Sequence, residues 1–151
     1  SILQACPNLK GILFDVPHVV ENARARIEQA SLTDRCELVG GDFFQSVPAG
    51  ADAYLMRHII HDWNDEKSLQ ILKNCHAALP VNGKLLVMES VIDLGNDPFA
   101  GKFVDLVMLL VTGGKERTAA EFQALYNQAG FKLTRILPTE SELSIIEGVK
   151  I

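Results

Sequence analysis

The segment MRHIIHDW, residues 56–63, contains two histidines three positions apart and is the part of the chain best suited to proton transfer. His61 follows an apolar run, and an imidazole with an ordinary pKa of about 6.5 can take up a proton near neutral pH. Such a base works best when a carboxylate holds its other nitrogen, because this fixes the tautomer and stabilises the imidazolium. Glu89 and Glu116 are the candidate carboxylates, although a glutamate placed before a helix can also serve only the helix dipole.

Two aspartates suggest a second kind of chemistry, the binding of a nucleotide. Asp15 and Asp42 each follow a short apolar run. An acidic residue at a strand end can accept hydrogen bonds from the two ribose hydroxyls in nucleotide-binding α/β folds, and Asp42 is placed to meet an adenine amino group. Phe43 can pack on the purine. The alternatives are a turn or helix-cap role for Asp15 and core packing for the aromatic ring.

These residues need a sheet to bring them together, and the sequence predicts one. Apolar runs alternate with helical patterns, which is typical of a mostly parallel sheet with helices on both faces. The last two strands have only a short connection and are therefore expected to be antiparallel. The predicted strands are 12–14, 36–39, 53–56, 84–88, 132–137 and 143–150, and the predicted helices are 21–30, 65–79, 99–111 and 118–129. Thr118 and Glu121 form a possible capping box, and Gly130 follows the end of that helix.

In an open parallel sheet, ligands bind outside the carboxyl ends of the strands. The residues that follow four successive apolar runs are polar or charged: Asp15, Asp42, Arg57 with His61, and Glu89. We therefore predict that these five side chains gather along one edge of a single sheet.

The composition favours a small-molecule enzyme made of one domain, residues 1–151. Of the 151 residues, 48% are hydrophobic and 22% are charged, which is ordinary for a globular protein. The net charge of −5 disfavours nucleic acid and anionic membranes as partners. No apolar run reaches membrane-spanning length and the first residues do not resemble a signal peptide, so we predict a cytoplasmic protein.

Five stretches of the sequence resemble the plant-type and bacterial small-molecule O-methyltransferases, in family order over most of residues 10–131. They are FDVPHVV, GGDFF, RHIIHDWNDE, ILKNCHAALPVNGKLLVMES and GGKERTAAEFQALYNQAGF. The resemblance implies a Rossmann-like methyltransferase sheet and the cofactor S-adenosylmethionine. It also implies a small aromatic or polyketide-like acceptor, whose hydroxyl is methylated without a metal ion.

The same resemblance assigns roles to individual residues. His61 is the implied general base, bracketed by Glu89 and Glu116. The implied cofactor residues are Asp15 at the ribose, Asp42 and Phe43 at the adenine, and Arg57 nearby. Phe103, Met108 and Thr112 fall in the segment that lines the acceptor pocket in this family.

By resemblance, the family's first strand, its glycine-rich loop and a helical domain that pairs two subunits would lie before Ser1. We therefore expect a homo-oligomer with an incomplete sheet. The alternative is a truncated, inactive methyltransferase-fold domain that acts only in association. Two other classes rank lower: a metal-dependent hydrolase using His58, His61 and Asp62, which lacks a convincing third histidine, and an NAD-dependent dehydrogenase using Asp15, whose fingerprint is absent.

Overall fold

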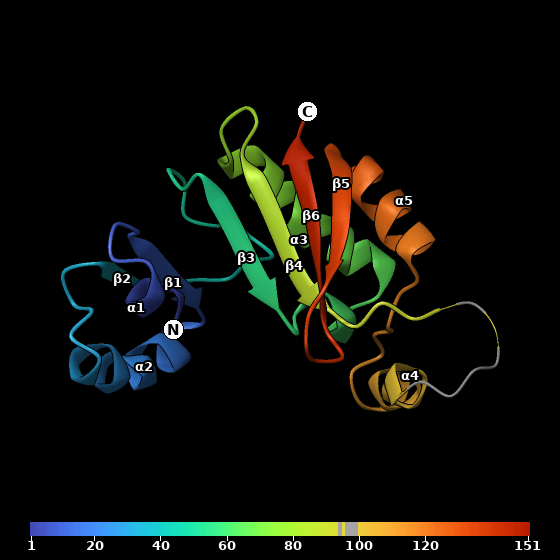
Figure 1. Ribbon diagram of the computed structural model, residues 1–151, viewed down its shortest axis with the longest axis horizontal. Helices are drawn as coiled ribbons and strands as arrows, with labels where there is room; N and C mark the ends of the chain where they lie inside the picture. The colour runs from blue at the N-terminus through green and yellow to red at the C-terminus, as the bar shows by residue number, and fades with distance from the viewer. Residues whose placement is uncertain (94, 96–99) are drawn as a thin grey trace. The chain divides into compact units, whose positions relative to one another are not determined.

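The structure is a computed structural model that describes residues 1–93, 95 and 100–151 (Figure 1). Its elements are α1 Ile2–Ala5, β1 Gly11–Asp15, α2 Pro17–Gln29, β2 Cys36–Gly40, β3 Ala53–Arg57, the 3₁₀ helix η1 Ile60–Asp62, α3 Asp65–Ala78, β4 Lys84–Glu89, α4 Ala100–Val111, α5 Ala119–Ala129, β5 Phe131–Pro138 and β6 Ser144–Lys150. The chain forms two compact units, residues 1–48 and 49–151.

In the first unit, β1 and β2 form a parallel pair with Asp15 opposite Gly40. Helix α2 begins four residues before the predicted start. The reason is Pro17, whose missing N–H costs nothing in the first turn and whose fixed φ already suits a helix. Val20 and Leu32 are the hydrophobic side chains buried here, among those the structure describes.

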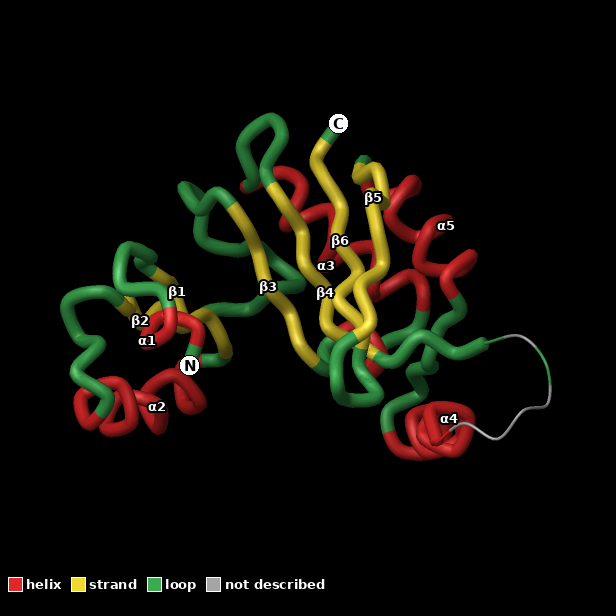
Figure 2. The backbone as a smooth tube through the Cα atoms, in the orientation of Figure 1, coloured by secondary structure: helices red, strands yellow, loops and turns green. Residues whose placement is uncertain are grey.

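The second unit contains a four-stranded sheet in the order β3-β4-β6-β5 (Figure 2). β3 and β4 are parallel, whereas β4 with β6 and β5 with β6 are antiparallel, which confirms the predicted closing pair. Helices α3 and α5 contact each other; in Figure 1 α3 passes behind the sheet and α5 lies beside β5, which it also contacts. Along β4, Leu85 and Val87 are buried while Leu86 and Met88 are partly exposed, so one face of the strand is better covered than the other.

The ends of α5 follow the predicted signals. Thr118 and Glu121 form the capping box, and Gly130 takes a left-handed φ of 86° at the C-cap. The hydrophobic core of this unit gathers between α3, α5 and the sheet. Its most buried members are Ile71, Leu72, Cys75, Leu85, Val87, Phe122, Tyr126, Phe131 and Ile146.

The prediction that the five side chains share one sheet was wrong, whereas the expectation of an incomplete sheet was confirmed. β1 and β2 form a sheet of their own, and no described strand joins β1 to β3. Helix α4 begins at Ala100, and residue 99 of the predicted helix lies outside the described residues. In the part of the chain that the structure describes, no helix has both the length and the apolar character needed to cross a bilayer.

Candidate active site

A tight turn after β3 carries the candidate base. β3 ends at Arg57, and the backbone N–H of His58 still donates to the carbonyl oxygen of Met88 on the neighbouring strand, at 3.3 Å. His58 has a φ of 54°, a left-handed conformation that is uncommon for residues other than glycine. The chain then enters η1, where buried Ile60 anchors the turn and His61 follows it. This turn places His61 beyond the carboxyl end of β3.

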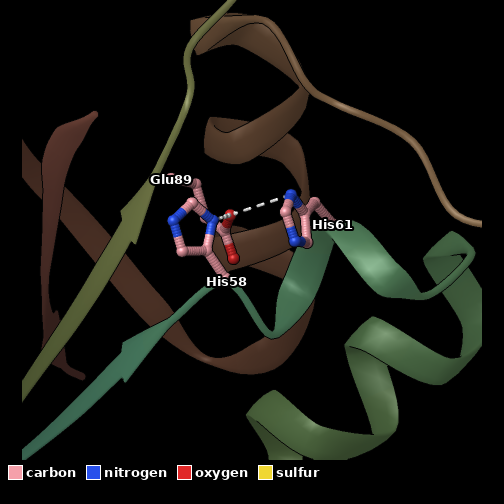
Figure 3. Close-up of side chains that lie close together, drawn as sticks. All are labelled: His58, His61 and Glu89. Atoms are coloured by element: carbon pink, nitrogen blue, oxygen red, sulfur yellow. Dashed lines mark ion pairs between the residues drawn. The ribbon is translucent and has the colours of Figure 1, made fainter. Parts of the chain in front are cut away.

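Glu89, the last residue of β4, fastens this turn from the next strand. Its Oε1 accepts hydrogen bonds from the backbone N–H groups of Ile59 and Ile60, both at 2.9 Å. Its Oε2 lies 3.5 Å from Nδ1 of His61 and 3.9 Å from Nδ1 of His58 (Figure 3). The side chain is fully buried. Glu89 therefore fixes the backbone that carries His61 and adds a negative charge beside the imidazole.

Glu116 makes the shorter contact with His61. Its Oε1 lies 2.8 Å from Nδ1 of His61, and its side chain is 1% exposed. The backbone N–H of Glu116 donates to Asp105 Oδ1 on α4, at 2.8 Å. Since a carboxylate accepts, Nδ1 carries the proton and Nε2 keeps its lone pair. Nε2 lies 3.7 Å from Asp62 Oδ1, too far for a hydrogen bond.

The sequence favoured neither Glu89 nor Glu116 as the partner of His61, and the structure brings both to its ring. The hydrogen bond that His61 donates to Glu116 raises the pKa of His61; burial opposes this rise, and the charges of Glu89, Glu116 and Asp62 reinforce it. Burial raises the pKa of Glu89, against the effect of the His61 charge and the two backbone N–H groups. Among the described residues, Glu89 Oε2 and Glu116 Oε2 are buried without a hydrogen-bond partner.

Arg117 is a positioning residue that sequence reasoning missed. Its guanidinium is 1% exposed and donates to the carbonyl oxygens of Ile60 and Trp63, at 3.0 and 2.9 Å. It also donates to Ser68 Oγ at 3.1 Å and to Asp65 Oδ1 at 2.9 Å. The only signal in the sequence was its place in GGKERT, which assigns it no partner. Arg117 thus ties the turn that carries His61 to the start of α3.

Gly114 lies where the segment before α5 passes close to the turn that carries His61. The N–H of Lys115 donates to the carbonyl oxygen of His61 at 3.0 Å, so the two backbone segments run side by side. A Cβ on Gly114 would overlap that same oxygen and the backbone of Asp62 and Trp63. Only a glycine allows this close approach.

The candidate cofactor residues of the first unit lie at one end of its sheet. The N–H of Gly41 donates to the carbonyl oxygen of Asp15 at 2.9 Å, which holds the two strand ends together. Asp15 Oδ1 accepts from the N–H of Val16, and Asp42 Oδ1 accepts from the N–H of Phe44 at 2.8 Å. Local hydrogen bonds of this kind fit the alternative role of Asp15 in a turn or helix cap. They also orient the carboxylates of Asp15 and Asp42. Asp15 and Asp42 are thus neighbours at this edge, in a different sheet from Arg57, His61 and Glu89.

The residues predicted to line the acceptor pocket lie on or beside α4. Phe103 is 71% exposed, and Met108 is partly buried one turn before exposed Thr112. The hydroxyl of Thr112 donates to the carbonyl oxygen of Met108 at 2.9 Å. Arg57 is exposed at the end of β3. The contact between Asp105 and Glu116 connects α4 to the site.

Comparison with known proteins decides the family. The profile of the O-methyltransferase domain matches residues 1–132. The chain belongs to this family. Among its relatives, the phenazine O-methyltransferase PhzM of Lysobacter antibioticus is 50% identical over 148 residues, which cover 98% of this chain and 43% of the relative. The caffeic acid 3-O-methyltransferase of Clarkia breweri is 48% identical over 99% of this chain and 40% of its own length.

Solved structures of O-methyltransferases share the fold. The crystal structure of LaPhzM has a TM-score of 0.95 at 50% identity and covers 99% of this chain and 45% of that one. NcsB1 from neocarzinostatin biosynthesis, in complex with S-adenosylmethionine and 2-hydroxy-5-methyl naphthoic acid, has a TM-score of 0.91 at 35% identity and covers 99% of this chain and 44% of that one. The chain thus spans less than half the length of the O-methyltransferases it matches.

Proposed function

We propose that this chain belongs to an enzyme that transfers a methyl group from S-adenosylmethionine to a hydroxyl of a small aromatic or polyketide-like acceptor. The observation that carries the proposal is the 2.8 Å contact between Nδ1 of His61 and buried Glu116. This contact holds the ring proton on Nδ1, so Nε2 keeps the lone pair that a base needs. The chain also belongs to the O-methyltransferase family. The complex of NcsB1 with S-adenosylmethionine and a hydroxynaphthoic acid supports the cofactor and the acceptor class.

His61 acts on the acceptor proton. Nε2 would take the proton of the acceptor hydroxyl as the oxygen–methyl bond forms and the methyl–sulfur bond breaks, which leaves a neutral thioether. Glu116 and Glu89 would stabilise the resulting imidazolium. Bound S-adenosylmethionine supplies an electrophilic methyl group on its sulfonium. A positioned base contributes roughly 10²- to 10⁴-fold to the rate. Alignment of the reacting atoms contributes the larger share, about 7–11 kcal/mol in favourable cases.

The residues proposed for the cofactor have suitable chemistry. Asp15 and Asp42 offer carboxylate oxygens, which accept hydrogen bonds from ribose hydroxyls and from the adenine amino group. Phe43 offers a ring for the purine and contacts Phe44 edge to face, with ring centroids 4.9 Å apart. Arg57 is proposed to lie near the cofactor. Phe103, Met108 and Thr112 are proposed to line the acceptor pocket, and the assembly is proposed to be a cytoplasmic homo-oligomer.

A pair of substitutions tests the division of labour, in a full-length enzyme that carries this sequence. His61→Gln should lower kcat by about 10²- to 10⁴-fold and leave cofactor affinity within a few-fold, because the base acts only in the transition state. Asp15→Ala should mainly weaken cofactor binding. Calorimetric titration of S-adenosylmethionine gives the affinities. Equal losses of cofactor affinity in the two variants would contradict these roles.

A further inference from the structure

His58, His61 and Glu89 form a cluster that includes the proposed base and has the side chains of a metal site. One ligand atom from each residue lies within 4.8 Å of the other two. Figure 3 shows the Glu89 carboxylate between the two imidazole rings. Imidazole nitrogen and carboxylate oxygen are the ligands that zinc and similar divalent transition-metal ions prefer.

The spacing suits such an ion. Zinc binds nitrogen and oxygen at about 2.0–2.1 Å, so two ligand atoms on a tetrahedral ion are about 3.3 Å apart. Glu89 Oε2 lies 3.5 Å from Nδ1 of His61 and 3.9 Å from Nδ1 of His58. The three ligand atoms lie within 4.8 Å of one another, so side-chain shifts must bring them together around an ion, and the hydrogen bond from His61 Nδ1 to Glu116 must break. His58 has the most room to adjust, because its side chain is 45% exposed.

The charges around the cluster favour a cation. Glu89 Oε2 is buried and has no hydrogen-bond partner among the described residues, so it is a ligand without a competing donor. Glu116 and Asp62 place further carboxylates beside His61. Arg57, whose charge acts on His58, is the opposing cation. The carboxylates of Glu89, Glu116 and Asp62 outnumber this one cation, so the local charge favours a bound metal ion.

We infer that this cluster binds one divalent transition-metal ion of the zinc class, through His58 Nδ1, Glu89 Oε2 and His61 Nδ1, with water completing the coordination. The ion takes the place of the Nδ1 proton of His61, which leaves to solvent. Neutral imidazole has one remaining proton, which must then sit on Nε2. Nε2 loses the lone pair that a base requires, so the ion is an inhibitor. This consequence rests on the proposed function, whereas the binding itself does not.

Zinc titration of the chain tests the site, with binding read by calorimetry and with Co²⁺ absorption as a second probe. All proteins carry Cys6→Ser, because Cys6 is an exposed thiol that can bind metal. We expect one ion per chain, and at least tenfold weaker binding in His58→Gln and in Glu89→Gln. The latter keeps an Oε1 for the N–H groups of Ile59 and Ile60. His18→Gln, at an exposed histidine of the first unit, should bind as the parent does.

Three results would overturn the inference: no stoichiometric binding, equal affinity in the parent and in both site variants, or loss of binding in His18→Gln. Circular dichroism of each variant checks that the fold is retained. Because the readout is the ion itself, failure of this site would leave the methyltransferase proposal standing. Conversely, a methyl-transfer assay that contradicts the base role would leave the zinc titration unchanged.

Discussion

At the scale of single residues, the site depends on how one imidazole is held. Glu116 makes the 2.8 Å contact with Nδ1, and Glu89 fixes the backbone of the same turn. The sequence made His61 and both carboxylates candidates because each follows an apolar run or precedes a helix, and the structure brings the three side chains together. The sequence could not choose between Glu89 and Glu116, since their distances to the ring depend on contacts between segments far apart in the chain.

The charge of Glu116 should matter more than its shape. Glu116→Gln keeps a side chain of the same size but removes the charge that stabilises the imidazolium. A hydrogen bond to a charged group contributes about 1.5–3 kcal/mol, so kcat should fall about 10- to 100-fold. Steady-state kinetics of the full-length enzyme measures this loss, with exposed Glu140→Gln as the control. A kcat within a factor of two of the parent would show that Glu116 has only a structural role.

At the scale of elements, the turn that carries His61 is held by the segment before α5. Arg117 donates to the carbonyl oxygens of Ile60 and Trp63, and Gly114 permits the close approach of the two backbones. The helix ends could be predicted from Thr118, Glu121 and Gly130, because capping is local in sequence. The role of Arg117 could not, because a buried arginine takes its meaning from carbonyl oxygens more than fifty residues away.

Gly114→Ala should destabilise the second unit. The added Cβ overlaps the backbone at His61, and neither segment can move without breaking the hydrogen bond between Lys115 and His61. We expect a loss of about 1–3 kcal/mol in the free energy of unfolding, measured by urea denaturation. Gly11→Ala is the matched control, because its Cβ would meet only the flexible side chain of Leu3, at 3.3 Å. Equal stability of the two variants would contradict the proposed close approach.

The pairing of Asp65 with Arg117 predicts a pH dependence of stability. Burial opposes the shift, but hydrogen bonds from Arg117 and Lys115 lower the pKa of Asp65. A carboxyl whose pKa is lower in the folded state than in the unfolded state stabilises the fold. This stabilisation is fully present above the unfolded-state pKa of about 3.9 and is lost as the pH falls through the folded-state pKa. Asp65→Asn should therefore cost about 0.5–1 kcal/mol at pH 7, a modest amount because the side chain is 61% exposed.

This cost should shrink as the pH falls below about 4, because Asp65 of the unfolded parent then takes up a proton, and it should vanish once the pH is below the lowered pKa of folded Asp65. Urea denaturation at a series of pH values measures the difference between the two proteins. Glu66→Gln, in the same first turn of α3, is the control and should show no comparable trend. A cost that stays constant down to pH 3 would show that the charge of Asp65 does not contribute.

At the scale of the whole molecule, the chain divides into two units with unequal cores. Apolar runs predicted every strand of both sheets, because they report local burial. They could not predict that β1 with β2 and β3 with β4 belong to separate sheets, since pairing is decided by contacts between distant segments. Of the buried hydrophobic side chains in the described residues, only Val20 and Leu32 belong to residues 1–48.

This imbalance predicts unequal protection from hydrogen exchange. Local stability follows buried apolar contacts, so the amides of β1 and β2 should exchange faster than those of β4 and β6. Mass-spectrometric exchange on the intact chain measures both sheets in one sample. Equal protection of the two sheets would indicate a single cooperative unit and would contradict the division.

If His61 removes the proton of the acceptor hydroxyl, the rate lost in His61→Gln must depend on the acidity of that hydroxyl. Single-turnover rates of the full-length enzyme and of His61→Gln are compared for two acceptors of similar shape, one with a neutral hydroxyl and one already ionised at the assay pH. A base is needed only for the first. We expect a loss of about 10²- to 10⁴-fold for the neutral acceptor and a loss below tenfold for the ionised one. Equal losses for both acceptors would contradict this role of His61.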